Sequence, residues 1–134
     1  MASIAPPANL SAYVASKYAV DGLSEVLAME FQGSGITVSC LHPGVINTAI
    51  VQDSSRTHMA PGEVARLQRH YREHGDHPRV VAEDIANGVL RREGTILSGK
   101  GVARVALMKR LLPRRAFRKL LIAASRKMGY LPLQ

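Results

Sequence analysis

The chain has 134 residues, enough for one domain with its own core, and its 46% apolar and 21% charged residues are ordinary for a globular protein. Its single cysteine, Cys40, excludes an internal disulfide framework. The sequence has no apolar run of the roughly 20 residues that a membrane-spanning helix needs. Nor does it open with the basic and apolar regions of a secretory signal. We therefore expect a cytoplasmic protein.

The net charge of +8 is unevenly distributed along the chain. Residues 1–99 contain 8 Lys/Arg and 10 Asp/Glu, a net charge of −2, whereas residues 100–134 contain 10 Lys/Arg and no acidic residue, a net charge of +10. The basic character thus belongs to one segment. This division predicts a main part, residues 1–99, followed by a basic tail, residues 100–134.

The first elements are a loop and a long helix. Residues 1–9 are proline-rich and favour a loop. Apolar residues at helical spacing predict a helix from Leu10 or Ser11 to Gln32, which glycines at 33 and 35 end. Gly22 interrupts this helix, which indicates close packing against a neighbour.

The next residues alternate between strand and helix patterns. Residues 36–41 predict a buried parallel strand, residues 51–61 an irregular segment, and residues 95–98 a short edge strand. Two helices lie between them, at residues 61–74 and 79–92. The second should turn these side chains inward: Val80, Val81, Ile85, Val89 and Leu90. This order is typical of an α/β fold with a parallel sheet.

In the tail, leucines alternate with basic residues, and Pro113 should divide it into two helices. Three roles remain open for it. It could be a cap packed on the domain or on a partner subunit, or a basic amphipathic anchor at an anionic membrane surface, which would make the protein membrane-peripheral. Nucleic acid binding is the least favoured, because Phe117 is the one aromatic residue near its middle and no stacking platform is present.

Tyr13 and Lys17 are candidate catalytic residues. They are four positions apart on the predicted helix and therefore share one face. A phenol alone has a pKa near ~10 and is a poor base at neutral pH, but a cation within about 4–6 Å favours the phenolate. A tyrosine so assisted can give a proton to a ketone oxygen or take one from an alcohol. The pair alone is a weak signal, because an aromatic anchor beside a solvated lysine is the more common interpretation of this spacing.

Three stretches of sequence carry a family pattern. Residues 13–25 read Tyr-x-Ala-Ser-Lys-x-Ala-Val-x-Gly-Leu-Ser-Glu, residues 35–38 read Gly-Ile-Thr-Val, and residues 42–48 read His-Pro-Gly-Val-Ile-Asn-Thr. They resemble the second half of a short-chain dehydrogenase/reductase (SDR), and the resemblance continues more loosely to about residue 99. It implies a Rossmann-like sheet and hydride transfer between NAD or NADP and a small alcohol or carbonyl compound.

The resemblance also implies residue roles. Tyr13 would be the acid/base, and Lys17 would lower its pKa, while both contact the cofactor. The loop after the strand lies where open α/β sheets bind ligands. In this loop the resemblance implies a nicotinamide pocket formed by Pro43, Gly44, Val45, Ile46 and Thr48. It also implies that residues 10–32 pack against their own copy in a homo-oligomer.

The sequence departs from the family pattern at its start. It has no Gly-rich strand-turn-helix for the cofactor's phosphates. The family's catalytic serine lies about thirteen residues before the tyrosine, whereas Ser3 lies ten before Tyr13, so Ser3 is not assigned that role. We therefore expect a truncated SDR, inactive alone, that represents the carboxyl-terminal half. The alternative is a non-enzymatic remnant or association module that uses the apolar helix and basic tail.

The remaining candidates have structural interpretations. His70 and His74 are spaced i, i+4, but no carboxylate or thiolate accompanies them at a fixed spacing, so we expect no metal site there. Cys40 is expected to be a small core residue. His42 is expected to be structural.

Overall fold

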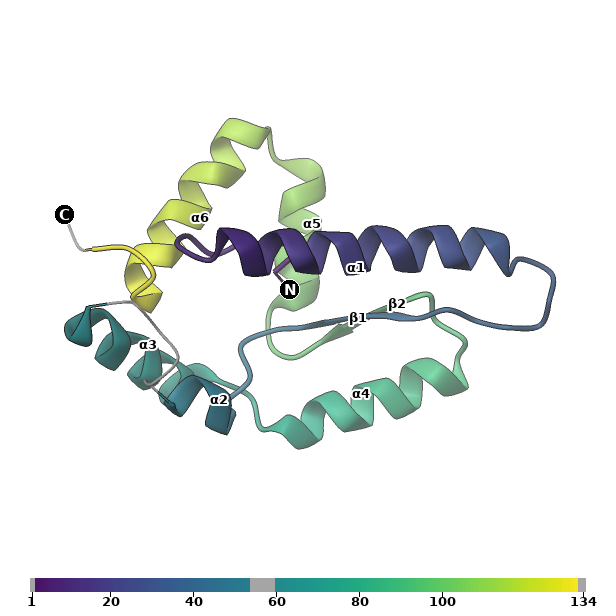
Figure 1. Cartoon of the computed structure of the whole chain (residues 1–134), viewed down its shortest axis with the longest axis horizontal. Helices are drawn as coiled ribbons and strands as arrows, with labels where there is room; N and C mark the ends of the chain where they lie inside the picture. Colours follow the sequence, from purple (N-terminus) through teal and green to yellow (C-terminus); the bar gives the residue numbers. More distant parts are fainter. Residues whose placement is uncertain (1, 54–59, 133–134) are drawn as a thin grey trace.

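A computed structural model describes residues 2–53 and 60–132 of the chain. It shows an α/β protein with a small parallel sheet and surrounding helices (Figure 1). The elements, in chain order, are α1 (Ser11–Glu30), β1 (Cys40–Pro43), α2 (Ala49–Gln52), α3 (Pro61–His74), α4 (Pro78–Leu90), β2 (Thr95–Ser98), α5 (Val102–Leu111) and α6 (Arg114–Met128). The fold class predicted from the sequence is confirmed.

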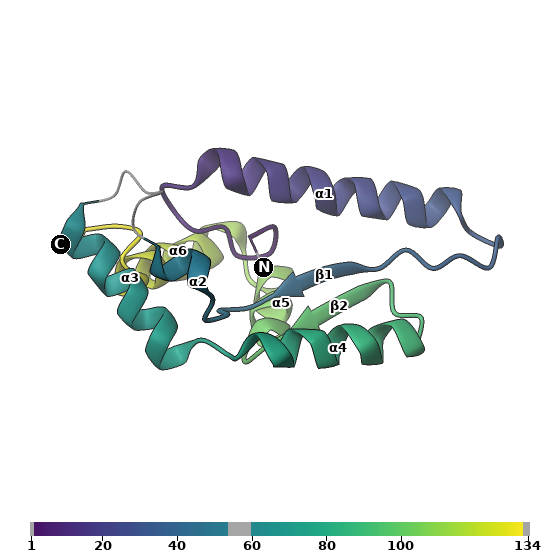
Figure 2. The ribbon, with the colours of Figure 1, turned by 60° about the horizontal axis from the view of Figure 1, so that its bottom comes forward.

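β1 and β2 form a two-stranded parallel sheet, in register from Cys40 opposite Thr95 to Pro43 opposite Ser98. Parallel neighbours need a crossover connection, and the segment between the two strands contains α4, which packs on β2. The turned ribbon shows α1 on one side of the sheet and α4 on the other (Figure 2). The strands therefore form the middle of three layers.

Close packing between α4 and β2 depends on Gly88. A Cβ atom at this position would lie 2.5 Å from Cδ1 of Ile96, which is itself buried. Because Gly88 has no side chain, α4 can approach the sheet closely enough to cover Ile96. This contact is one part of a small core that also contains these residues: Ile4, Val102, Phe117 and Tyr130.

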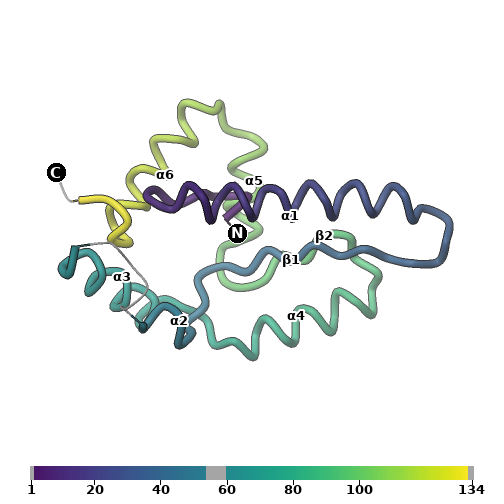
Figure 3. The backbone as a smooth tube through the Cα atoms, viewed as in Figure 1, coloured from purple at the N-terminus to yellow at the C-terminus, as the bar shows by residue number. Residues whose placement is uncertain are grey.

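The first strand begins later than predicted. The sequence pattern gives residues 36–41, but pairing with β2 starts where the backbone N–H of Cys40 donates to the carbonyl of Gly94, 2.8 Å away. The chain turns back after α1 and runs alongside it before pairing starts (Figure 3). Ile36 remains 58% exposed. The β-favouring residues before Cys40 thus lack a partner strand among the described residues.

Two packing expectations are wrong within this chain. An added Cβ at Gly22 would meet nothing within 4 Å, and α1 has no buried residue. On α4, Ile85 is 39%, Val89 58% and Leu90 82% exposed, although all three were expected to point inward. The apolar periodicity is present on both helices, but each packs on only a narrow part of the two-stranded sheet.

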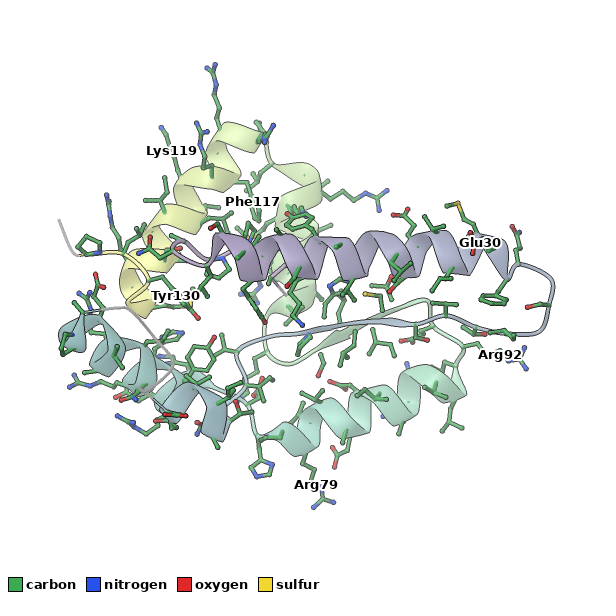
Figure 4. The ribbon with its side chains drawn as sticks, in the orientation of Figure 1. Glu30, Arg79, Arg92, Phe117, Lys119 and Tyr130 are labelled. Atoms are coloured by element: carbon green, nitrogen blue, oxygen red, sulfur yellow. The ribbon has the colours of Figure 1, made fainter. Side chains whose placement is uncertain are left out.

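The tail forms two helices separated at Pro113, as predicted. Val102 is fully buried at the start of α5, and Phe117 of α6 (labelled in Figure 4) is 9% exposed. Leu107 and Leu111, in contrast, are 55% and 69% exposed. The tail therefore contributes to the core through some of its apolar residues and exposes others.

Asp76 links the carboxyl ends of both strands. Its backbone N–H donates to the carbonyl of Val45, and its carbonyl accepts from the N–H of Asn47. Its buried carboxylate accepts the N–H of Lys100 at 2.7 Å and lies 3.1 Å from the Lys100 ammonium group. The N–H and the ammonium group of Lys100 lower the pKa of Asp76. One residue therefore holds the loop after β1 against the turn after β2.

We predict that Asp76→Asn lowers the free energy of unfolding at neutral pH by about 1–3 kcal/mol, because it weakens buried charge-assisted hydrogen bonds. Asp76 has a lowered pKa in the folded protein, so its contribution is present above the unfolded pKa near ~3.9 and is lost as pH falls through the folded pKa. Denaturant unfolding at several pH values measures both effects.

The matched control is Glu83→Gln, which removes the exposed ion pair between Arg79 and Glu83. This variant should change the free energy of unfolding by less than about 0.5 kcal/mol. Equal stabilities of the two variants at neutral pH would show that Asp76 does not anchor the strand ends.

Candidate functional site

A cavity of about 370 Å³ lies beside the carboxyl end of β1. Its walls come mainly from the amino-terminal segment, α1, β1 and the loop that follows β1. Tyr71 of α3, Met128 at the end of α6 and Tyr130 after α6 complete them. Most of these residues are apolar or aromatic. A concave, mainly apolar site with a few polar groups is typical of small-molecule binding.

Tyr13 and Lys17 both line this cavity from the first half of α1. Helical geometry places them on successive turns of one face, and the ammonium nitrogen of Lys17 lies 5.4 Å from the centroid of the Tyr13 ring. This distance is within the range of a cation–π contact. Tyr13 is 51% exposed, so its phenol is accessible to a ligand in the cavity.

The loop after β1 contributes three of its five candidate residues to the cavity. Pro43, Gly44 and Val45 line the wall, whereas Ile46 and Thr48 do not. Ile46 instead forms a β-bridge with Asp76, and Thr48 precedes α2 in extended conformation.

Gly44 is required where it stands. A Cβ atom there would lie 2.7 Å from a methyl group of Val102, which is fully buried and cannot move aside easily. The N–H of Gly44 also donates to the carbonyl of Ser98. The loop backbone is thus fixed from below by β2 and α5, and its other side faces the cavity.

Ser3 is a cavity residue that the sequence analysis set aside. It is 4% exposed, and its hydroxyl oxygen lies 3.2 Å from Nδ1 of His42. Its carbonyl accepts a hydrogen bond from the Lys109 ammonium group at 2.7 Å. The proline-rich segment brings Ser3 to the cavity that Tyr13 also lines. The separation of Ser3 and Tyr13 along the sequence does not predict this placement.

Tyr71 and Tyr130 form a second pair of phenols at the cavity. Their hydroxyl oxygens lie 3.1 Å apart, and Tyr130 is buried. Burial raises the pKa of Tyr130, so its hydroxyl keeps its proton at neutral pH and remains a hydrogen-bond donor. Tyr130 follows α6 (Figure 4), so the tail supplies part of this cavity. The sequence analysis did not identify either phenol.

His42 and Cys40 lie on neighbouring inward positions of β1. His42 is 4% exposed, and burial lowers its pKa although Asp21, 3.4 Å from its Nε2, opposes this shift. Cys40 is half-buried, and burial raises the pKa of its thiol. By contrast, His70 and His74 are stacked on the surface of α3, with ring centroids 4.7 Å apart.

Comparison with known proteins identifies the relationship. The family model for the short chain dehydrogenases matches residues 1–59, the part that contains Tyr13, Lys17 and the loop after β1. Over these residues the chain is similar to the short-chain dehydrogenase family. The family resemblance inferred from the sequence is therefore confirmed, and NAD or NADP is the cofactor that this family uses in general.

Three relatives illustrate the similarity. The putative oxidoreductase SadH of Mycobacterium tuberculosis is 31% identical over 110 residues, which cover 76% of this chain and 38% of SadH. The uncharacterized oxidoreductase YbbO of Escherichia coli is 32% identical over 117 residues, 82% of this chain and 41% of YbbO. Cyclohexanol dehydrogenase of an Acinetobacter strain is 37% identical over 51 residues, 38% of this chain and 20% of that enzyme.

The short-chain dehydrogenase match extends over a limited part of each relative. The chain spans about two fifths of the length of SadH and YbbO, and less of cyclohexanol dehydrogenase. No solved structure matches the chain significantly. Among the described residues, no helix has both the length and the apolar character that crossing a membrane requires.

Proposed function

We propose that this chain carries the acid/base and nicotinamide-facing part of an NAD(P)-dependent oxidoreductase that interconverts an alcohol and a carbonyl compound. The observation that carries the proposal is the shared cavity: Tyr13, Lys17 and the backbone of residues 43–45 line one space of about 370 Å³. The match of residues 1–59 to the short-chain dehydrogenase family and the oxidoreductase relatives support the same reaction class.

The residues at the cavity suit the nicotinamide end of the cofactor. Gly44 has no side chain, and Pro43 and Val45 present an apolar surface on which a flat ring can lie. When bound, the nicotinamide supplies or accepts the hydride. Ile46 and Thr48 would position the part of this loop that follows the cavity wall. The described residues contain no Gly-rich strand-turn-helix beside the cavity to hold the phosphates.

The chain's own groups handle the proton and the orientation of the substrate. Tyr13 would donate its phenolic proton to the carbonyl oxygen, or accept a proton from the alcohol in the reverse direction. Lys17 would stabilise the phenolate and contact the cofactor ribose. The hydroxyl of Ser3, which lines the same cavity, would hydrogen-bond the same substrate oxygen.

The cavity favours an apolar substrate. Val20, Leu41 and Met128 add apolar surface to its walls. One relative is named as a cyclohexanol dehydrogenase, which matches this chemistry. We propose a small apolar alcohol or ketone as the substrate class.

We predict that Tyr13→Phe lowers kcat by about 10²–10⁴-fold in the natural protein that contains this sequence, because the variant loses only the proton-transferring hydroxyl. Lys17→Ala should lower both kcat and the affinity for the dinucleotide. The measurement is NAD(P)H absorbance with a panel of cyclic and linear ketones, together with thermal unfolding to verify the fold.

Tyr18→Phe is the matched control, because Tyr18 lies on the same helix but does not line this cavity. It should retain activity. Unchanged turnover in Tyr13→Phe would contradict the assignment. A protein that shows no oxidoreductase activity in either form would favour the alternative function, a non-enzymatic association module.

We also propose that α1 is the interface of a homo-oligomer. The side of α1 that faces the sheet holds its half-buried residues, which include Asp21 and Ser24, whereas the opposite side carries small exposed residues: Ala12, Ala15, Ala19 and Gly22. Small residues allow two helix backbones to approach closely, and the open space beside Gly22 leaves room for a second copy. The neighbouring apolar Leu23 and Val26 are 58% and 45% exposed.

We predict that the chain is a dimer and that Ala19→Arg makes it a monomer, because a charged side chain would enter the helix interface. The matched control is Ala86→Arg, at an exposed position on α4, which should remain a dimer. Size-exclusion chromatography with light scattering measures both. A wild-type monomer, or equal masses for the two variants, would contradict the interface.

For the basic tail, residues 100–134, we propose contact with an anionic membrane surface in addition to its capping role, a function that residues 1–99 do not share. Its exposed leucines 107 and 111 accompany the exposed basic residues Arg115 and Lys119. Figure 4 shows Lys119 pointing away from the rest of the molecule. A second cavity of about 600 Å³ also combines apolar walls with basic side chains of α5 and α6.

We predict that Arg115→Gln combined with Lys119→Gln weakens binding to phosphatidylserine vesicles by roughly 30-fold, since each basic residue near the surface contributes about 1 kcal/mol. Binding should also decrease with salt. The control, Arg69→Gln with Arg92→Gln, removes the same charge from exposed sites outside the tail. Vesicle binding is measured by co-sedimentation. Equal weakening of binding in both double variants would contradict the membrane role.

A further inference from the structure

Three side chains of different chemistry meet between α1 and β1. Asp21 is on α1, while Cys40 and His42 are two residues apart on β1 and so project from the same face of the strand. Oδ1 of Asp21 lies 3.4 Å from Nε2 of His42 and 3.5 Å from Sγ of Cys40. All three atoms lie within 4.8 Å of one another.

This spacing matches the coordination sphere of a tetrahedral metal. Zinc binds sulfur, nitrogen and oxygen ligands at about 2.0–2.3 Å, so two ligand atoms of one tetrahedron lie roughly 3.3–3.8 Å apart. The two distances from Asp21 are already in this range. The sulfur and the imidazole nitrogen lie within 4.8 Å of each other, and a rotation of these two side chains on one strand would set their separation.

The surroundings of His42 prepare it as a ligand. Metal-bound histidines usually donate their second ring N–H to an oxygen atom, which fixes the tautomer and orients the ring. Ser3 supplies such an oxygen, 3.2 Å from Nδ1 of His42. Nε2 of His42 faces Oδ1 of Asp21, so this is the nitrogen that a metal shared with Asp21 would contact.

We propose that Asp21, Cys40 and His42 form a binding site for a divalent transition metal, zinc(II) first among them, with one coordination position left open. Three protein ligands and a fourth exchangeable position are typical of zinc sites that bind a water or a substrate oxygen. Cys40 and His42 both line the 370 Å³ cavity, so the metal would lie at its wall. On binding, the Cys40 thiol releases its proton to solvent.

The site has an access route and a structural consequence. The Asp21 side chain is 38% exposed, so a metal ion can reach the cluster from solvent. The metal would also join α1 to β1, two elements that otherwise touch through few residues. Binding to the folded state alone should therefore raise the thermal stability of the protein.

The experiment titrates the purified, reduced chain with cobalt(II) and then with zinc(II). We expect one cobalt ion per chain, a thiolate-to-cobalt charge-transfer band in the near ultraviolet, and displacement of cobalt by zinc with a rise in melting temperature. Cys40→Ser should abolish the charge-transfer band, and Asp21→Asn should weaken cobalt binding at least tenfold.

A matched control removes the competing surface histidines. His70→Gln with His74→Gln should leave the charge-transfer band and the affinity unchanged, because these residues provide only two nitrogen ligands and no thiolate. The proposal is overturned if cobalt does not bind. It is also overturned if cobalt binds without the charge-transfer band and the His70/His74 variant loses the binding. Cys40→Ser distinguishes these outcomes without a substitution at the buried His42.

Discussion

The clamp made by Asp76 is the constraint on which the cavity depends. Two strands of four residues each offer few backbone hydrogen bonds, so their ends need further support. Asp76 provides it with its backbone, which pairs with the loop after β1, and with its carboxylate, which holds Lys100 after β2. Because Gly44 and Val45 lie in the loop so held, the clamp also fixes one wall of the cavity.

Much apolar surface remains uncovered around this small sheet. Parallel sheets are usually buried on both faces by helices that are themselves covered, yet α1 has no buried residue and Leu90 of α4 is 82% exposed. Exposed apolar surface of this extent is characteristic of interfaces. The same helix that carries Tyr13 and Lys17 thus has its outer side available for a partner. The proposed dimer contact and the proposed acid/base pair therefore both lie on α1.

Local sequence signals predict most of the helices and strands, whereas they do not predict contacts between residues that are far apart in the sequence. Pro61 at the start of α3 and Pro113 between α5 and α6 mark boundaries that the structure reproduces, because proline restricts its own backbone. Pairing of β1, in contrast, begins only where β2 lies opposite, so the pattern of β-favouring residues placed it too early. Ser3 and Tyr130 reach the cavity from the two ends of the chain, and their positions in the sequence do not predict that they meet there.

The proposed functional residues of α1 lie on one face of the helix. Tyr13, Lys17 and Asp21 are spaced i, i+4 and i+8, so they occupy successive turns of the same face of the helix. The first two face the cavity, and the third contacts His42 and Cys40 on β1. A rigid shift of α1 would therefore move the proposed acid/base and the proposed metal ligand together. Since few contacts within the chain hold this helix on the sheet, whatever covers its outer side would set the geometry of both sites at once.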